Sequence, residues 1–238
     1  MATSTIQLSR TIARSSQYAR LEPLTFASNT NNDPAFSNAD WVKQTILAPP
    51  FGWRWNRTIK GTPSAPAFVT VAGTSDYKVN LSNFGWLEKA VLYDPNSGYN
   101  PTELQVELLK GEDTNPTVPQ RIAAQLDDGE GNITFRIFPA PDQIYNVCLI
   151  YQNAATLFTS TTNTWTPIPD YMSYVYNEGM DYKTFEYLAD PRAQTSGQLF
   201  FQSLAQMSEG LSESQKNLWA QDRLNSIRQQ GTIQSGRG

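Results

Sequence analysis

The sequence predicts an α+β protein: a discontinuous α-helical bundle, formed by N- and C-terminal helices, with an inserted antiparallel β-sandwich or barrel. Apolar residues recur at helical spacing in residues 1–48 and 167–230, whereas they alternate with polar residues in residues 51–166. Neither helical region is large enough to bury its apolar stripe alone. We therefore expect these two regions to form one bundle domain, with the β domain inserted between them.

Two helices are expected in residues 1–48. Ile6 and Ile12 fit a short helix near the start of the chain. Asp33-Pro34 is typical of a helix start, with an N-cap followed by proline in the first turn. Pro49-Pro50 ends this second helix, because proline lacks the backbone N–H that would continue it.

Short runs with a period of two residues, separated by turns, fill residues 51–166. About seven such runs are typical of an antiparallel sandwich or barrel. Four predicted inward faces are Tyr77, Val79 and Leu81; Leu104, Val106 and Leu108; Ile133, Phe135 and Ile137; and Tyr145, Val147, Leu149 and Tyr151.

The second helical region, residues 167–230, begins after the sharp turn Pro167 to Asp170. Met172 starts an apolar stripe that runs until Asp190-Pro191, which ends or kinks the helix. Further apolar residues at helical spacing continue to Gly231, a predicted C-cap. Residues 231–238 are rich in glycine and polar residues, so we expect a flexible C-terminal tail.

Charge is low and unevenly distributed. Charged residues make up 17% of the chain, below the roughly 25% of typical soluble domains, and the net charge is −4. Residues 1–20 carry +3 and residues 213–238 carry +2, which leaves −9 in residues 21–212. The basic ends indicate contact with an acidic partner, or they are arginines on solvated helices; the sequence leaves both readings open.

Few groups suited to catalysis are present. The chain has no histidine and one cysteine, Cys148, which excludes the usual triads and thiolate metal clusters. Asp127, Asp128 and Glu130 offer a carboxylate pair or a site for a hard cation, but acidic residues beside glycine are more often turn formers. We expect no enzyme activity, no metal and no cofactor.

No apolar stretch approaches the roughly 18 residues of a membrane span. We expect no signal peptide and no membrane association. The chain then folds in a reducing cytoplasm, where Cys148 in its apolar run is a buried, inert thiol.

Three aromatic residues have two possible roles. Trp53, Trp55 and Tyr99 either pack in the core or at a subunit interface, or form a surface that stacks sugars or bases. We favour packing, because Trp53 and Trp55 would share one face of a strand. The isoelectric point of about 4.9 opposes DNA binding through phosphates.

Several motifs occur in a recognisable order. The aromatic segment FGWRWNRT is followed by a threonine-rich strand in FVTVAGTSDYKVN. The later ones are Phe138-Pro139-Ala140-Pro141, the strand Tyr145 to Tyr151, the polar stretch Thr159 to Asn163, and Ile168-Pro169-Asp170. In this order, across residues 41–190, they resemble the phage head-to-tail adaptors of the tail tubular protein A type.

The resemblance implies a structural virion protein at the head–tail junction, assembled in the host cytoplasm. Twelve copies would form a homo-oligomeric ring below the portal protein, extend the DNA channel and dock the tail hub, nozzle or tail fibres. DNA would pass without sequence-specific binding, because an acidic channel wall repels phosphates. We assign the portal contact to the C-terminal residues Gln229, Gln230, Ile233 and Arg237.

A second function remains open at this point. Trp53, Trp55 and Tyr99 would serve a carbohydrate-binding or receptor-binding tail component if their rings were exposed.

Overall fold

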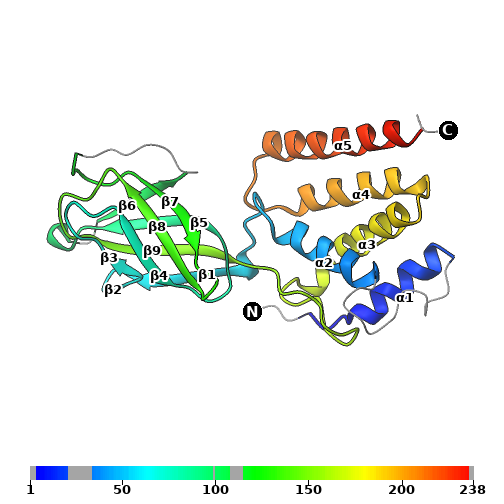
Figure 1. Ribbon diagram of the computed structural model, residues 1–238, viewed down its shortest axis with the longest axis horizontal. Helices are drawn as coiled ribbons and strands as arrows, with labels where there is room; N and C mark the ends of the chain where they lie inside the picture. The colour runs from blue at the N-terminus through cyan, green and yellow to red at the C-terminus, as the bar shows by residue number, and fades with distance from the viewer. Residues whose placement is uncertain (1–3, 21–33, 99, 108–114, 236–238) are drawn as a thin grey trace. The chain divides into compact units, whose positions relative to one another are not determined.

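A computed structural model describes residues 4–20, 34–98, 100–107 and 115–235 (Figure 1). Over these residues the chain is mixed α+β, with five α-helices and a curled, mainly antiparallel sheet. It divides into two compact units. The helical unit comprises residues 1–56 and 155–238, and the β unit comprises residues 57–154.

The helical unit is arranged around α3. Helix α3 contacts α1, α2 and α4, and α5 lies along α4 (Figure 1). Its helices are α1 (Leu8–Tyr18), α2 (Pro34–Leu47), α3 (Ser173–Tyr187), α4 (Arg192–Met207) and α5 (Glu213–Ser235), with short 3-10 turns η2 (Arg54–Asn56) and η4 (Asp170–Met172).

Large aromatic side chains dominate the core of the helical unit. Trp165 stacks on Tyr176 with ring centroids 4.3 Å apart, and both rings are fully buried. Gly179 lies at a close approach of three helices, since a Cβ there would lie 2.8 Å from Val42 Cγ1 and 2.9 Å from Phe200 Cε2. Helices α2, α3 and α4 therefore pack closely because α3 carries glycine at this point.

One curled sheet forms the β unit, in the order β2-β1-β9-β5-β6-β7-β8-β4, with β3 also paired to β9. The order leaves β2 and β4 at opposite ends, so the sheet is a half-barrel. Its strands are β1 (Arg57–Thr62), β2 (Ala65–Pro66), β3 (Phe68–Val69), β4 (Asp76–Asn80), β5 (Phe84–Tyr93), β6 (Pro101–Val106), β7 (Arg121–Asp127), β8 (Asn132–Phe138) and β9 (Asn146–Asn153).

Alternate residues of these strands fill the inside of the half-barrel. Register pairs Ala90 with Leu149 and Leu92 with Val147 on the inner face. The same core holds most of the predicted inward residues: Tyr77, Val79, Leu81, Leu104, Ile133, Phe135, Ile137, Tyr145, Val147, Leu149 and Tyr151. Val106 is exposed at the strand end, and Leu108 lies outside the described residues.

Of the two predicted forms, the sheet is closer to the barrel than to the sandwich, because it is one curled sheet rather than two packed sheets. It departs from the antiparallel prediction at one pair, since β6 pairs with β7 in parallel. A parallel pair needs a long connection, and residues 107–120 supply one. The turns in the sequence locate the strands but do not specify which strands become neighbours.

The limits of the β unit are narrower than residues 51–166. Phe51 and Trp53 belong to the core of the helical unit, as do Phe158 and Trp165. The expected strand through Trp53 and Trp55 is wrong, because residues 54–56 form η2. Trp53 is buried beside this turn. Its spacing of two from Trp55 therefore reflects the turn and not a pleated strand.

The last helix extends beyond its predicted end. Helix α5 continues through Gly231 to Ser235. Glycine costs only about 1 kcal/mol in a helix interior, so Gly231 weakens the helix without ending it. Residues 236–238 lie outside the described part of the chain, and the predicted flexibility of the tail stays a prediction.

Candidate functional site

The acidic turn between β7 and β8 has the contacts of a turn former. Asp128 accepts hydrogen bonds from the backbone N–H groups of Glu130 (2.9 Å) and Asn132 (3.1 Å), and its other oxygen lies 2.8 Å from Lys78 Nζ. Lys78 and these donors hold the pKa of Asp128 well below its usual range. The described contacts of Asp128 are thus all internal; the side chain of Asp127 lies outside the described part.

Three other features bear on catalysis, metal binding and membranes. Cys148 is buried, and burial raises the pKa of its thiol. Within the described ranges no three His, Cys, Asp or Glu side chains gather closely enough to hold a metal ion. Among the same residues no helix is both long and apolar enough to cross a bilayer.

Of the three predicted aromatic residues, Trp53 is closed to a stacking ligand. Trp53 is 2% exposed, donates its indole N–H to the Ile46 carbonyl over 2.6 Å, and stacks between Phe51 and Trp55. Trp55 is half-buried against the same core, and Tyr99 lies outside the described residues. A sugar or base therefore has no access to the ring of Trp53.

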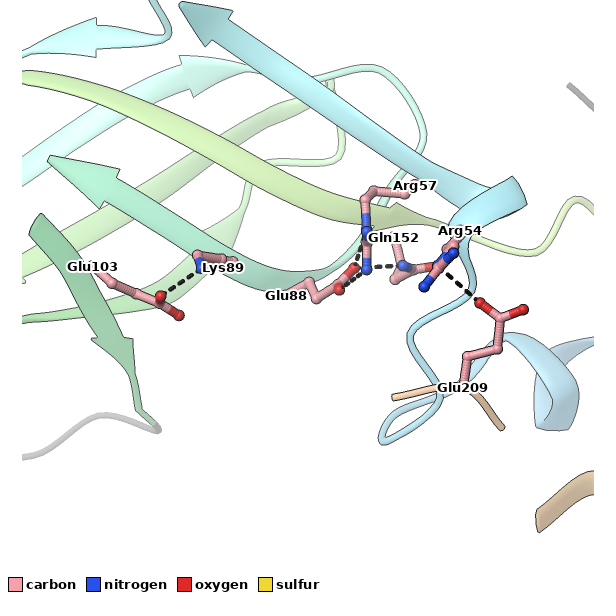
Figure 2. Close-up of polar contacts among 7 residues, drawn as sticks. All are labelled: Arg54, Arg57, Glu88, Lys89, Glu103, Gln152 and Glu209. Atoms are coloured by element: carbon pink, nitrogen blue, oxygen red, sulfur yellow. Dashed lines mark hydrogen bonds and ion pairs between the residues drawn. The ribbon is translucent and has the colours of Figure 1, made fainter. Parts of the chain in front are cut away.

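The sequence analysis missed two exposed tyrosines at the start of α3, of which Tyr171 contacts Trp55. Tyr171, in η4, is 59% exposed, and Tyr174 at the start of α3 is also exposed. Nearby, the Arg54 guanidinium pairs with Glu209 over 3.0 Å, as Figure 2 shows. The one sequence signal that could have indicated their exposure is that Tyr171 and Tyr174 do not belong to the apolar stripe of α3.

The motif Ile168-Pro169-Asp170, just before α3, is hydrogen-bonded to residues near the start of the sequence. Asp170 accepts hydrogen bonds from Thr5 Oγ1 (2.5 Å), Ser4 Oγ (2.7 Å) and the Thr5 backbone N–H (3.0 Å), which lower its pKa. Just before the motif, the Trp165 indole N–H donates to Thr11 Oγ1 of α1 over 3.0 Å. The motif is therefore architectural, because it joins segments from both ends of the sequence.

Helix α5 is the least buried helix of the helical unit. None of its described side chains is buried, and Leu218 is 70% exposed. Trp219 anchors it, with its ring 4.7 Å from that of Phe51 and 5.6 Å from that of Phe201. Over residues 213–225, where its side chains are described, α5 therefore offers exposed surface to a partner.

The predicted portal contacts fall on the last part of α5. Gln229, Gln230 and Ile233 lie within the helix, although their side chains are outside the described part of the chain. Arg237 lies outside the described residues altogether.

The outer face of the β unit carries paired charges. Arg57 on β1 makes a bidentate ion pair with Glu88 on β5, and Gln152 on β9 donates to the same carboxylate over 2.6 Å (Figure 2). Lys89 and Glu103 pair between β5 and β6 (Figure 2). These contacts link four strands, in the order β1, β9, β5 and β6.

Comparison with known protein families matches residues 17–229 to the family described as SU10 adaptor protein. The match covers most of the chain and includes parts of both units. It does not specify the tail tubular protein A type, which stays an expectation. Comparison with curated proteins finds no match.

Proposed function

Because the chain belongs to the SU10 adaptor protein family, a family of structural phage proteins, we propose that it is the head-to-tail adaptor of a bacteriophage. In this proposal copies of the chain form a closed ring, of twelve subunits as the resemblance implies, between the portal and the tail hub or nozzle. The ring lies at the head–tail junction and extends the DNA channel. The role is structural, without catalysis and without a cofactor.

The match over residues 17–229 is the observation that carries this proposal. A closed ring needs heterologous contacts, in which one surface of a subunit meets a different surface of the next. Such contacts require open, complementary surfaces.

The portal contact is assigned to the C-terminal part of α5. Gln229, Gln230, Ile233 and Arg237 lie at the end of the helix or just beyond it. The ring of Trp219, near the start of α5, packs against Phe51 and Phe201 of the helical unit, and the assigned residues lie ten or more positions farther along the chain. A surface of amides with one aliphatic residue and one arginine suits a wet, hydrogen-bonded interface.

DNA passes through the ring without sequence-specific contacts. The β unit holds seven basic and eleven acidic residues, a net charge of −4, which repels phosphates wherever it faces the channel.

Cryo-electron microscopy of the native particle tests the proposal. We expect a closed ring of this chain at the vertex that carries the tail. Finding the chain elsewhere in the particle, or as isolated monomers there, contradicts the proposal.

Two variants test the portal contact itself. Deleting residues 230–238 removes the end of α5; it should leave the rest of the fold intact, as measured by circular dichroism, and weaken binding to the purified portal. Leu218→Asp, on the exposed flank of α5, should also weaken portal binding. Leu199→Asp, at an exposed leucine of α4, is its matched control and should leave portal binding unchanged. Unchanged portal binding by the deletion variant rules out the assigned contact.

A further inference from the structure

Four exposed aliphatic side chains lie on neighbouring segments at one end of the β unit. They lie on segments that hydrogen-bond to one another: Thr70 N–H donates to the Tyr145 carbonyl (2.9 Å), Gly73 N–H to Pro141 (2.8 Å) and Thr117 N–H to Ala140 (2.9 Å). Thr70 and Tyr145 are buried, so the residues beside them face outward. We call this cluster the aliphatic tip; its members are Val69, Val71, Val118 and Ile144.

Acidic residues flank the aliphatic tip. Asp142 is exposed and accepts a hydrogen bond from Tyr145 Oη over 2.9 Å, and Asp94 accepts one from Gln143 Nε2 over 3.3 Å. Neither carboxylate has a cationic partner within the described residues, whereas Asp76, Glu88, Glu103, Glu107 and Asp128 of the same unit do. The tip is therefore an apolar surface with unneutralised negative charge at its rim.

The outer face of α1 has the opposite character. The helix LSRTIARSSQY contains two arginines and no acidic residue. Arg10 is exposed and has no ion pair in the described part of the chain, and the Tyr18 ring, one turn beyond Arg14, is 56% exposed. Arg14 pairs with buried Asp181 but still exposes about half of its side chain (48%). This face combines positive charge with an exposed aromatic ring, as protein interfaces often do.

We propose that the aliphatic tip of one copy of the chain docks on the outer face of α1 of a second copy. Charge complementarity selects this occupant, since two tips would repel through Asp94 and Asp142 and two α1 faces would repel through Arg10. The contact is heterologous, because different surfaces of the two copies meet. It deepens the proposed ring and rests on it, since it names the surfaces that join neighbouring subunits.

Charge reversal and mixing test the contact. Asp142→Lys would place lysine against Arg10, and Arg10→Glu would place glutamate against Asp142. Each variant alone should lose the concentration-dependent self-association that sedimentation velocity measures for the wild type, by about tenfold or more in the association constant. A mixture of the two variants should recover it, because the introduced lysine of one chain then meets the introduced glutamate of the other, and the remaining Asp142 meets the remaining Arg10.

Matched controls separate docking from folding. Ile144→Asp should weaken association, whereas Ile59→Asp, at an exposed isoleucine on β1 outside the tip, should not. Asp142→Asn keeps an acceptor for Tyr145 Oη and removes only the charge, so it should weaken association less than Asp142→Lys. Circular dichroism checks that each variant is folded.

The outcomes distinguish this contact from the proposed function. A ring in the native particle, with no recovery in the variant mixture, overturns the tip-to-α1 contact and leaves the adaptor function standing. Wild-type chain that does not self-associate at any concentration, or association equally weakened by Ile59→Asp, also overturns the contact. Absence of a ring from the particle overturns the proposed function instead.

Discussion

The helical unit and the β unit differ first in charge. The helical unit contains eleven basic and eleven acidic residues, so its net charge is zero, whereas the β unit contains seven and eleven. The net charge of −4 therefore resides in the β unit. An adaptor built this way has one neutral body and one acidic body, so solution conditions such as salt should act mainly on contacts of the β unit.

Ion pairs are also used differently in the two units. In the described part of the β unit all five pairs join different strands or turns, as Arg57–Glu88 and Arg136–Asp76 do. In the described part of the helical unit three of five pairs join residues two or three positions apart. Burial of large rings thus carries the tertiary structure of the helical unit, while cross-strand pairs support the register of the β unit.

A charge placed in the helical core should have the largest effect. Met172 is fully buried among residues from both ends of the chain, so Met172→Asp buries an unpaired charge or a neutral acid without partners. We expect a loss of more than about 4 kcal/mol in the free energy of unfolding. Tyr171→Asp, one residue earlier and exposed, should change it by less than about 0.5 kcal/mol. Urea denaturation followed by circular dichroism measures both, and wild-type stability of Met172→Asp would show that α3 packs differently.

A buried lysine makes the stability of the helical unit depend on pH. Lys43 on α2 is 3% exposed, donates to Thr156 Oγ1 over 3.1 Å and lies 4.6 Å from the centre of the Phe158 ring. Burial lowers the pKa of Lys43 to about 8, and nearby Asp40 opposes this shift.

The sign of the effect follows from proton binding. Between pH 8 and about 10 the unfolded chain keeps a proton on Lys43 that the folded chain releases, so the free energy of unfolding rises with pH. The rise amounts to as much as about 3 kcal/mol. Lys43→Met should remove it, and Lys60→Met, at an exposed lysine of β1, should not. Denaturation at several pH values compares the slopes; equal slopes for wild type and Lys43→Met contradict the assignment.

The close approach at Gly179 gives the next largest effect. Gly179→Ala places a methyl group 2.8 Å from Val42 Cγ1 and 2.9 Å from Phe200 Cε2, so α2 or α4 must move. We expect a destabilisation of about 1–3 kcal/mol, typical of overpacking. Gly210→Ala is the control, since its Cβ would have no neighbour closer than 3.9 Å. Thermal unfolding of both variants checks the difference.

The spacing of apolar residues predicted most helices and strands, because the buried face of each element determines that spacing. The alternation of Ile133, Phe135 and Ile137 matches a strand with one buried face, and the stripe beginning at Met172 matches α3. Periodicity failed where burial has another cause: Trp53 is buried beside a 3-10 turn, although its spacing from Trp55 mimics a strand.

Surfaces were harder to predict than elements. The aliphatic tip joins Val69, Val118 and Ile144, which are distant in the sequence and become neighbours only through the hydrogen bonds between their segments. Likewise, nothing in the composition of α5 indicates that Trp219 is its anchor, because Leu218 beside it is equally apolar and yet exposed.

A cross-strand ion pair should have the smallest effect. Glu88→Gln keeps the shape of the side chain that Arg57 and Gln152 contact but removes its charge. Because Arg57 is about one third exposed, solvent screens the pair, and we expect a loss below about 1 kcal/mol. Arg14→Gln in the helical unit is the informative counterpart: it leaves buried Asp181 without its cation and should cost more. Denaturant midpoints of the two variants decide the matter, and a larger loss for Glu88→Gln would mean that the β unit depends on its charges for more than register.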